Sequence, residues 1–167
     1  MGYFRAVAVD FDGTLAEGGC PDLAVLDALT EVRAQGLRVV LATRRILAEL
    51  QATFPDVDDH VDAVVAENGA LVTGPAGPRL LAPPVAEELA AALAARGVSC
   101  RQGEVLVACS GDDEHVVLAE VRRLGLDCQL VRNRGELMVL PAGDLGDHLV
   151  VGGGIEGIGP VRHGRSV

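Results

Sequence analysis

Two aspartates, Asp10 and Asp12, stand two positions apart near the start of the chain, within the sequence VDFDGTL. Side chains two apart on an extended chain point to the same side, so both carboxylates can face one pocket. Gly13 lets the backbone turn sharply and bring its amides toward a bound anion. Acids crowded in this way repel each other unless a cation or a shared proton compensates. The spacing therefore indicates metal-assisted phosphoryl transfer, and two surface acids in a turn are the simpler alternative.

The first part of the sequence predicts alternating strands and helices that position these acids. The apolar runs that predict buried strands are 6–9, 37–42 and 63–66. Helical periodicity is found at 21–35 and 46–54, and an acidic surface loop is expected at 56–59. Such alternation predicts an α/β fold with a parallel sheet and right-handed crossovers.

Ligands of parallel sheets bind beyond the carboxyl ends of the strands. Asp10, Thr43 and Asn68 each fall at such an end, so we expect these three side chains to meet at one edge. This placement is an independent indication of where the site lies.

After residue 69 the pattern changes to that of a small α+β lobe. A hairpin is expected at 70–81, helices at 85–96 and 113–124, and strands at 105–109, 127–131 and 136–140. We therefore predict three segments. They are residues 1–73 as the first part of a core, 74–139 as an inserted lobe, and 140–167 as the return to the core with a glycine-rich tail.

Composition narrows the class of protein. A formal net charge of −10 and only 2% aromatic residues argue against binding to nucleic acid. The four cysteines are scattered, which favours reduced thiols over a disulfide framework or a zinc site. No apolar run reaches membrane-spanning length and no signal-peptide pattern is present, so a cytoplasmic protein without membrane contact is expected. The sequence carries no signal for an oligomeric state.

The sequence DFDGT after an apolar run resembles the first motif of the haloacid dehalogenase (HAD) superfamily of phosphohydrolases. This resemblance implies that Asp10 is the nucleophile and that Asp12 is the general acid and base. It also implies Mg²⁺ held by Asp10 and Asp12, with a small phosphorylated metabolite as the partner. The fold it implies is a parallel, Rossmann-like HAD core with an inserted small α+β cap.

Two further segments resemble the Cof-like subgroup of that superfamily. Thr43, Arg44 and Arg45 stand where the subgroup commonly has Thr-Gly-Arg, and Asn68 begins its Asn-Gly-Ala signature. The resemblance implies that Thr43, Arg45, Asn68 and Gly13 bind the phosphate. Arg44 replaces the glycine of the subgroup, and it is either a further phosphate ligand or an exposed arginine at the start of a helix. Arg45 could equally hold a neighbouring acid, because its planar fork pairs well with carboxylates.

The third and fourth motifs of the superfamily are missing or degenerate. All 14 basic residues are arginines, and Gly146 stands near the position where relatives have a lysine. Gly153 and Gly157 occupy the positions of the metal-binding acids, which leaves Glu156 as the one carboxylate that could serve. The core is therefore expected to be incomplete at its C-terminus, as the truncated or altered end of a longer protein.

Two hypotheses follow from this pattern. The first is a HAD-like phosphatase that hydrolyses a small phosphomonoester through an aspartyl-phosphate with Mg²⁺. The second is a catalytically weak or inactive HAD-like domain that binds a ligand or partner, because loss of charged groups that stabilise a transition state costs orders of magnitude in rate.

Overall fold

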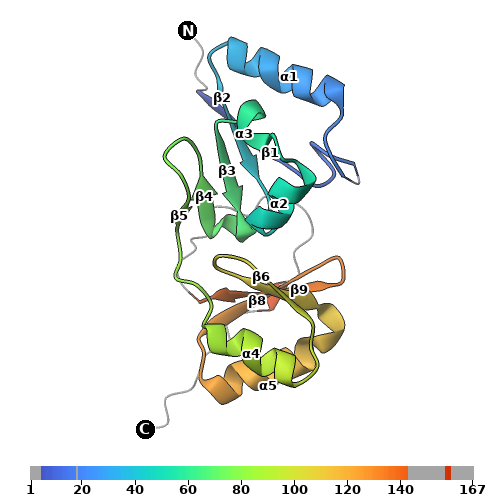
Figure 1. Cartoon of the computed structure of the whole chain (residues 1–167), viewed down its shortest axis with the longest axis vertical. Coiled ribbons are helices and arrows are strands. Elements are labelled where there is room, and N and C mark those ends of the chain that lie inside the picture. The colour runs from blue at the N-terminus through green and yellow to red at the C-terminus, as the bar shows by residue number, and fades with distance from the viewer. Residues whose placement is uncertain (1–4, 18, 143–156, 159–167) are drawn as a thin grey trace. The chain divides into compact units, whose positions relative to one another are not determined.

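The computed structural model describes residues 5–17, 19–142 and 157–158 and divides the chain into two compact units (Figure 1). The first unit is Met1–Leu81 and the second is Ala82–Val167. Each unit has its own five-stranded sheet and its own cluster of buried hydrophobic side chains. The alternation of helices and strands confirms the predicted α/β class.

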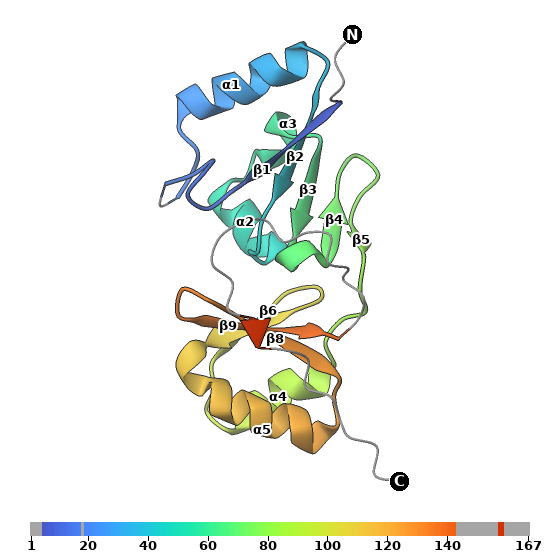
Figure 2. The same cartoon turned by 180° about the vertical axis from the view of Figure 1, so that it is seen from behind.

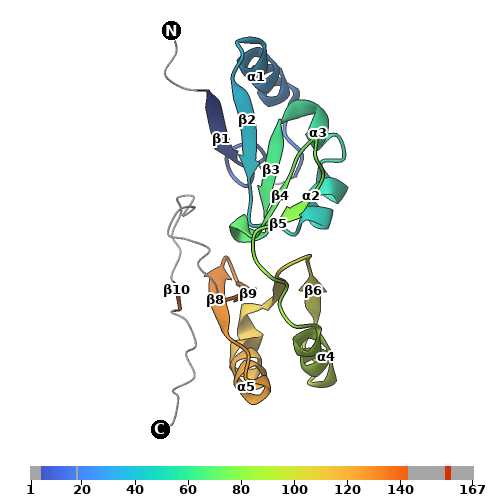
Figure 3. The ribbon, with the colours of Figure 1, turned by 90° about the vertical axis from the view of Figure 1, so that its left-hand side faces the viewer.

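The sheet of the first unit is mixed. Strands β1 (Ala6–Asp10), β2 (Arg38–Ala42) and β3 (Ala63–Ala66) are parallel, and Figure 3 shows their arrowheads pointing the same way. Strands β4 (Leu71–Thr73) and β5 (Arg79–Leu80) continue the sheet antiparallel to β3. The predicted parallel sheet is thus present at the three strands whose ends carry the candidate residues.

Three helices connect these strands. They are α1 (Leu23–Ala34), α2 (Leu47–Thr53) and α3 (Val57–His60). The carboxylate of Asp22 caps α1 by accepting a hydrogen bond from an amide of the first turn. Each helix contributes apolar side chains to the cluster that packs on the strands, among them Leu29, Leu50 and Val57.

The prediction of an acidic surface loop at 56–59 is wrong in one respect. Val57 is buried in the first cluster and anchors the short helix α3, so the segment is helical. Its three carboxylates, Asp56, Asp58 and Asp59, are nevertheless exposed to solvent as expected.

The second unit is an antiparallel sheet with two helices on one face. Its strand order is β10-β8-β9-β7-β6, and helices α4 (Glu87–Ala95) and α5 (Glu114–Leu124) lie side by side against it (Figures 1 and 2). The strands are β6 (Cys100–Gln102), β7 (Val107–Ser110), β8 (Cys128–Asn133), β9 (Glu136–Pro141) and β10 (Gly157–Ile158). This is the α+β lobe that the sequence predicts.

The segment boundaries predicted at residues 73 and 140 stay predictions. The hairpin β4–β5 belongs to the first unit, whereas β9 belongs to the second. Most of 140–167 lies outside the described residues; of its tail, Gly157–Ile158 pairs with β8. Among the helices that the structure describes, none is long and apolar enough to cross a membrane.

Candidate active site

The three parallel strands of the first unit end level with one another, and each has a polar residue at its last position or directly after it. In the register, Asp10 is opposite Ala42, and Ala42 is opposite Val65. The ladder continues past the strands, because the Thr43 amide donates to the carbonyl oxygen of Val65 at 2.8 Å. Asp10 and Thr43 therefore share one edge of the sheet, which is the edge where parallel sheets bind ligands.

Asp10, the last residue of β1, and Asp12, in the loop that follows, flank a buried phenylalanine. Phe11 is fully buried, and Asp10 and Asp12 on either side of it are partly exposed. Gly13 has a φ of +84°, a conformation that favours glycine, and its amide donates to the Ala16 carbonyl at 3.0 Å. The turn therefore depends on Gly13, whose amide is engaged within the loop itself.

Arg45 binds the carboxylate of Asp12 in a bidentate manner, through two of its guanidinium nitrogens. Its Nε lies 3.1 Å from each carboxylate oxygen, and its Nη2 lies 2.6 Å from Oδ1. The guanidinium also lies over the ring of Phe11, 4.9 Å from the ring centroid. These two contacts fix the guanidinium, which in turn fixes the orientation of the Asp12 carboxylate. Arg45 therefore holds a neighbouring acid, one of the two roles that the sequence left open for it.

Thr43 is a buried residue whose hydroxyl contacts the backbone of Arg45. The residue is 6% exposed, and its Oγ1 accepts a hydrogen bond from the Arg45 amide at 3.1 Å. Because the amide is the donor in that bond, the hydroxyl hydrogen remains available to donate to another oxygen.

The segment after β3 has an unusual backbone. Glu67 and Asn68 have φ values of 54° and 58°, in the short 3₁₀ turn Glu67–Gly69. Asparagine adopts this left-handed conformation more readily than glutamate, for which it costs on the order of 1 kcal/mol or more. Glu67 is fully buried, and its amide donates to the Arg45 carbonyl at 3.0 Å.

Glu67 is the residue at this edge to which the sequence patterns assign no role. Its position directly after β3 matches that of Thr43 directly after β2 and of Asp10 as the last residue of β1, and this is the signal that could have found it. Strained, fully buried and hydrogen-bonded to the segment that carries Arg45, it ties the end of β3 to the end of β2.

For the remaining predicted site residues, the structure gives their position on the chain and their burial. Arg44 and Asn68 are half-buried in the turns that follow β2 and β3, and Glu156 lies outside the described residues. The structure thus joins Asp12 to Arg45 and Arg45 to Thr43 by hydrogen bonds, with Asp10 on the same edge.

The oxygens at this edge suit a hard cation in part. A carboxylate on Asp10 and the oxygens of Asp12 are ligands of the type that Mg²⁺ prefers. Within the described residues, no group of three or more His, Cys, Asp or Glu side chains is arranged to hold a metal ion.

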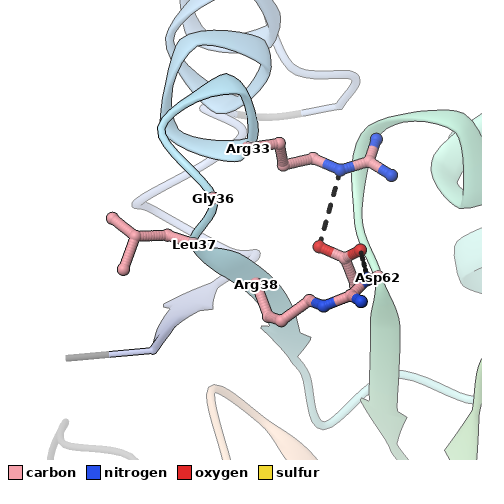
Figure 4. Close-up of a pocket in the computed structure, with 5 residues that line it drawn as sticks. All are labelled: Arg33, Gly36, Leu37, Arg38 and Asp62. Carbon is pink, nitrogen blue, oxygen red and sulfur yellow. Dashed lines mark hydrogen bonds and ion pairs between the residues drawn. The ribbon is translucent and has the colours of Figure 1, made fainter.

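A surface hollow of about 420 Å³ lies elsewhere on the same unit (Figure 4). Its lining includes Asp62, which pairs with Arg38 at 2.8 Å and Arg33 at 3.5 Å. Hydrogen bonds from the Val39 amide and then from Arg38 hold the pKa of the Asp62 carboxyl below its usual range. Because Arg38 begins β2 and Asp62 precedes β3, this hollow lies at the opposite edge of the sheet from Asp10.

Comparison with known proteins identifies the family. A family model described as haloacid dehalogenase-like hydrolase matches residues 7–120. This range contains Asp10, Asp12, Thr43, Arg45 and Asn68. Among curated proteins, none matches the chain significantly.

Several solved structures share the fold at low sequence identity. A haloacid dehalogenase-like hydrolase from Bacteroides thetaiotaomicron has a TM-score of 0.63 at 14% identity, over 84% of this chain and 72% of that chain. A sugar phosphatase of HAD subclass IIB has a TM-score of 0.58 at 18% identity, over 84% and 71% of the two chains. A trehalose-6-phosphate phosphatase related protein has a TM-score of 0.58 at 13% identity, over 83% and 68%.

Proposed function

The chain belongs to the haloacid dehalogenase-like hydrolase family, and from that premise we propose that it is a phosphatase acting on a small phosphomonoester through an aspartyl-phosphate at Asp10. The observation that carries this proposal is the arrangement of two carboxylates at the end of β1, of which Asp12 is fixed by Arg45. A nucleophile needs a neighbouring acid and base in a defined orientation, and this arrangement supplies one.

In the first step a carboxylate oxygen of Asp10 attacks phosphorus, and the bond between phosphorus and the leaving oxygen breaks. The leaving oxygen takes a proton from the Asp12 carboxyl, which becomes a carboxylate. In the second step that carboxylate takes a proton from water as the water attacks phosphorus, which releases phosphate and restores Asp10. Arg45 keeps Asp12 aimed at the reacting oxygens through both steps.

Three side chains are proposed to hold the phosphoryl oxygens. The Thr43 hydroxyl can donate without losing its bond to the Arg45 amide, and Arg44 and Asn68 stand in the adjoining turns. Gly13 contributes the sharp turn that brings the loop to the phosphate. Donors fixed in this way stabilise the negative charge on the phosphoryl oxygens in the transition state.

Mg²⁺ is the proposed cofactor. The Asp10 carboxylate and the Asp12 backbone carbonyl would hold it, with Glu156 as the third protein ligand. When bound, the ion neutralises phosphate charge and orients the phosphoryl group for attack.

The second unit is proposed to act as the cap, as segment 74–139 was predicted to do, and to select the substrate. Phosphorylated sugars are the first compounds to test, because two of the similar folds are named for sugar phosphates. The cytoplasm is the proposed compartment, on the pattern of scattered cysteines.

A specific observation also favours the alternative, a domain that binds phosphate without turning it over. The chain contains no lysine, and the described residues bring no third acid to Asp10 and Asp12. The first feature removes a cation that would neutralise phosphate charge, and the second weakens the binding of Mg²⁺, so both reduce stabilisation of the transition state.

The test is phosphate release from an aryl phosphate with Mg²⁺, comparing the wild type with Asp10→Asn. The proposal expects turnover that falls by a factor on the order of 10³ or more in this variant. Asp27→Asn, an exposed position of α1, is the matched control and should keep full activity. Turnover that is the same in Asp10→Asn would overturn the enzyme proposal. Beryllofluoride bound at Asp10 with no turnover would favour the binding domain.

A further inference from the structure

Two cysteines of the second unit face each other across the β6–β7 hairpin. Cys100 on β6 is the direct partner of Cys109 on β7 in the antiparallel register. The hairpin closes with a hydrogen bond from the Gly103 amide to the Leu106 carbonyl at 2.9 Å. Hydrogen-bonded and non-hydrogen-bonded pairs alternate from there, so Cys100 and Cys109 form a non-hydrogen-bonded pair. In such pairs the Cα atoms are about 4.5 Å apart, which is the closest spacing in a sheet.

Both thiols also lie on the same face of the sheet. Cys109 is 4% exposed within the second hydrophobic cluster, and half-buried Cys100 packs against that cluster. Each sulfur lies 3.8 Å from a backbone carbonyl oxygen, Cys100 from Val98 and Cys109 from Leu137. Disulfides form at Cα separations of roughly 4.4–6.8 Å, so this backbone can accept the bond without rearrangement of the strands.

We propose that Cys100 and Cys109 are a reversible disulfide site that is oxidised by small-molecule disulfides. The Cys100 thiolate attacks a sulfur of the reagent, forms a mixed disulfide and releases one thiolate. The Cys109 thiolate then attacks the Cys100 sulfur, forms the bond between the strands and releases the second thiolate. The cysteines lose two electrons and two protons, and the reagent is reduced to two thiols.

The order of attack follows from exposure. Cys100 is the more accessible of the two, whereas Cys109 is buried and is positioned to resolve the mixed disulfide. Burial and then Asp113 raise the pKa of the Cys100 thiol, and burial, Cys100 and Asp113 raise that of Cys109 to about 12, against a smaller lowering by Arg101. Thiolates are scarce at neutral pH, so the exchange is slow there and accelerates as pH rises.

The other two cysteines lack this geometry. Cys20 is exposed, and its thiol donates to the Thr53 carbonyl at 2.6 Å. Cys128 is buried on β8, where its register partner is Pro141. The site is therefore one pair among four thiols, which makes the pairing directly measurable.

Tryptic mapping of the full chain after oxidation tests the pairing. Because the chain has arginine but no lysine, trypsin separates the four cysteines onto peptides 6–33, 97–101, 102–122 and 124–132. The protein is incubated with oxidised glutathione at pH 8.5, alkylated, digested without reductant and analysed by mass spectrometry. The proposal expects 97–101 joined to 102–122, and dithiothreitol should release both peptides.

Two variants complete the experiment. Cys20→Ser should leave the linked peptides unchanged. In Cys109→Ala, oxidation should stop at the mixed disulfide between Cys100 and glutathione. The wild-type map does not depend on whether either variant folds. Peptides 97–101 and 102–122 that stay unlinked, carry only glutathione, or link to 124–132 would each overturn the proposal.

Discussion

Arg45 contacts both carboxylate oxygens of Asp12 through Nε and Nη2, at distances of 2.6 to 3.1 Å, and lies over the ring of Phe11. The two residues are 33 positions apart and come from the ends of neighbouring parallel strands. A bidentate contact fixes both the direction and the rotation of the carboxylate, which the single ammonium group of a lysine cannot do.

Arg45→Lys is therefore expected to lower kcat by roughly 10- to 100-fold while KM changes little, because the charge remains and the orientation of Asp12 is lost. The loss of kcat should be larger for alkyl phosphates than for aryl phosphates, because a poor leaving group depends more on protonation by Asp12. Steady-state kinetics on matched substrates measure this difference. Arg38→Lys, at the opposite edge of the sheet, is the control. An equal loss on both substrate types would contradict an orienting role toward Asp12.

In the second unit, Glu120→Gln is expected to lower the free energy of unfolding by about 1–3 kcal/mol. Glu120 is 2% exposed and pairs with Arg96 at 2.9 Å and Arg123 at 2.6 Å, so it ties the end of α4 to α5. Urea unfolding measures the change, with the exposed Glu88→Gln of α4 as the control. Equal midpoints for the two variants would show that this ion-pair network contributes no stability.

A stabilising change is available at the β8–β9 turn. Arg134 and Gly135 have φ values of 45° and 85°, the pattern of a two-residue hairpin turn that favours asparagine followed by glycine. Arg134→Asn should relieve backbone strain and raise the free energy of unfolding by about 0.5–1 kcal/mol. Thermal unfolding should show a higher Tm, and Gly135→Ala should show a lower one. A lower Tm in Arg134→Asn would mean that its side chain contributes more than its backbone costs.

Stability is expected to fall as pH rises above about 9. Burial raises the pKa of Cys109 to about 12 and that of Cys128 to about 11, whereas unfolded thiols ionise near pH 8.5. Above pH 9 the unfolded state loses thiol protons that the folded state keeps, which favours unfolding. Between the unfolded and the folded pKa, each buried thiol lowers the free energy of unfolding by about 1.4 kcal/mol per pH unit.

Unfolding by urea at pH 7, 9 and 10.5 checks this dependence. The absence of lysine removes the groups that usually titrate in the same range. Cys128→Ala should flatten the decline, and Cys20→Ser should leave it unchanged. A free energy of unfolding that is flat up to pH 10.5 would contradict the expectation.

Much of the fold follows from apolar periodicity. The strand predicted at 63–66 is β3, and the helices predicted at 21–35 and 46–54 contain α1 and α2. By contrast β6 was not predicted, because Cys100–Gln102 is short and mostly polar and becomes a strand through its pairing with β7. Helix α3 depends on burial of Val57, a tertiary contact that local sequence does not report.

The candidate site was only partly predictable. Strand ends and spacing placed Asp10, Asp12 and Thr43 on one edge, since parallel strands bring their ends together. The partner of Arg45 required the packed structure, because either a phosphate or an acid would suit its guanidinium. The positive φ of Glu67 is a backbone feature for which the sequence carries no signal beyond the following Asn68-Gly69.

The central claim is a covalent bond between phosphorus and Asp10, and chemical trapping of that bond tests it most directly. The enzyme is mixed with an aryl phosphate and Mg²⁺, quenched with borohydride, which reduces an acyl phosphate to an alcohol, and digested to peptide 6–33. Fragmentation should locate the reduced residue at Asp10, and Asp10→Asn should give none. Phosphate release with an unmodified peptide, or reduction at Asp12, would contradict the account.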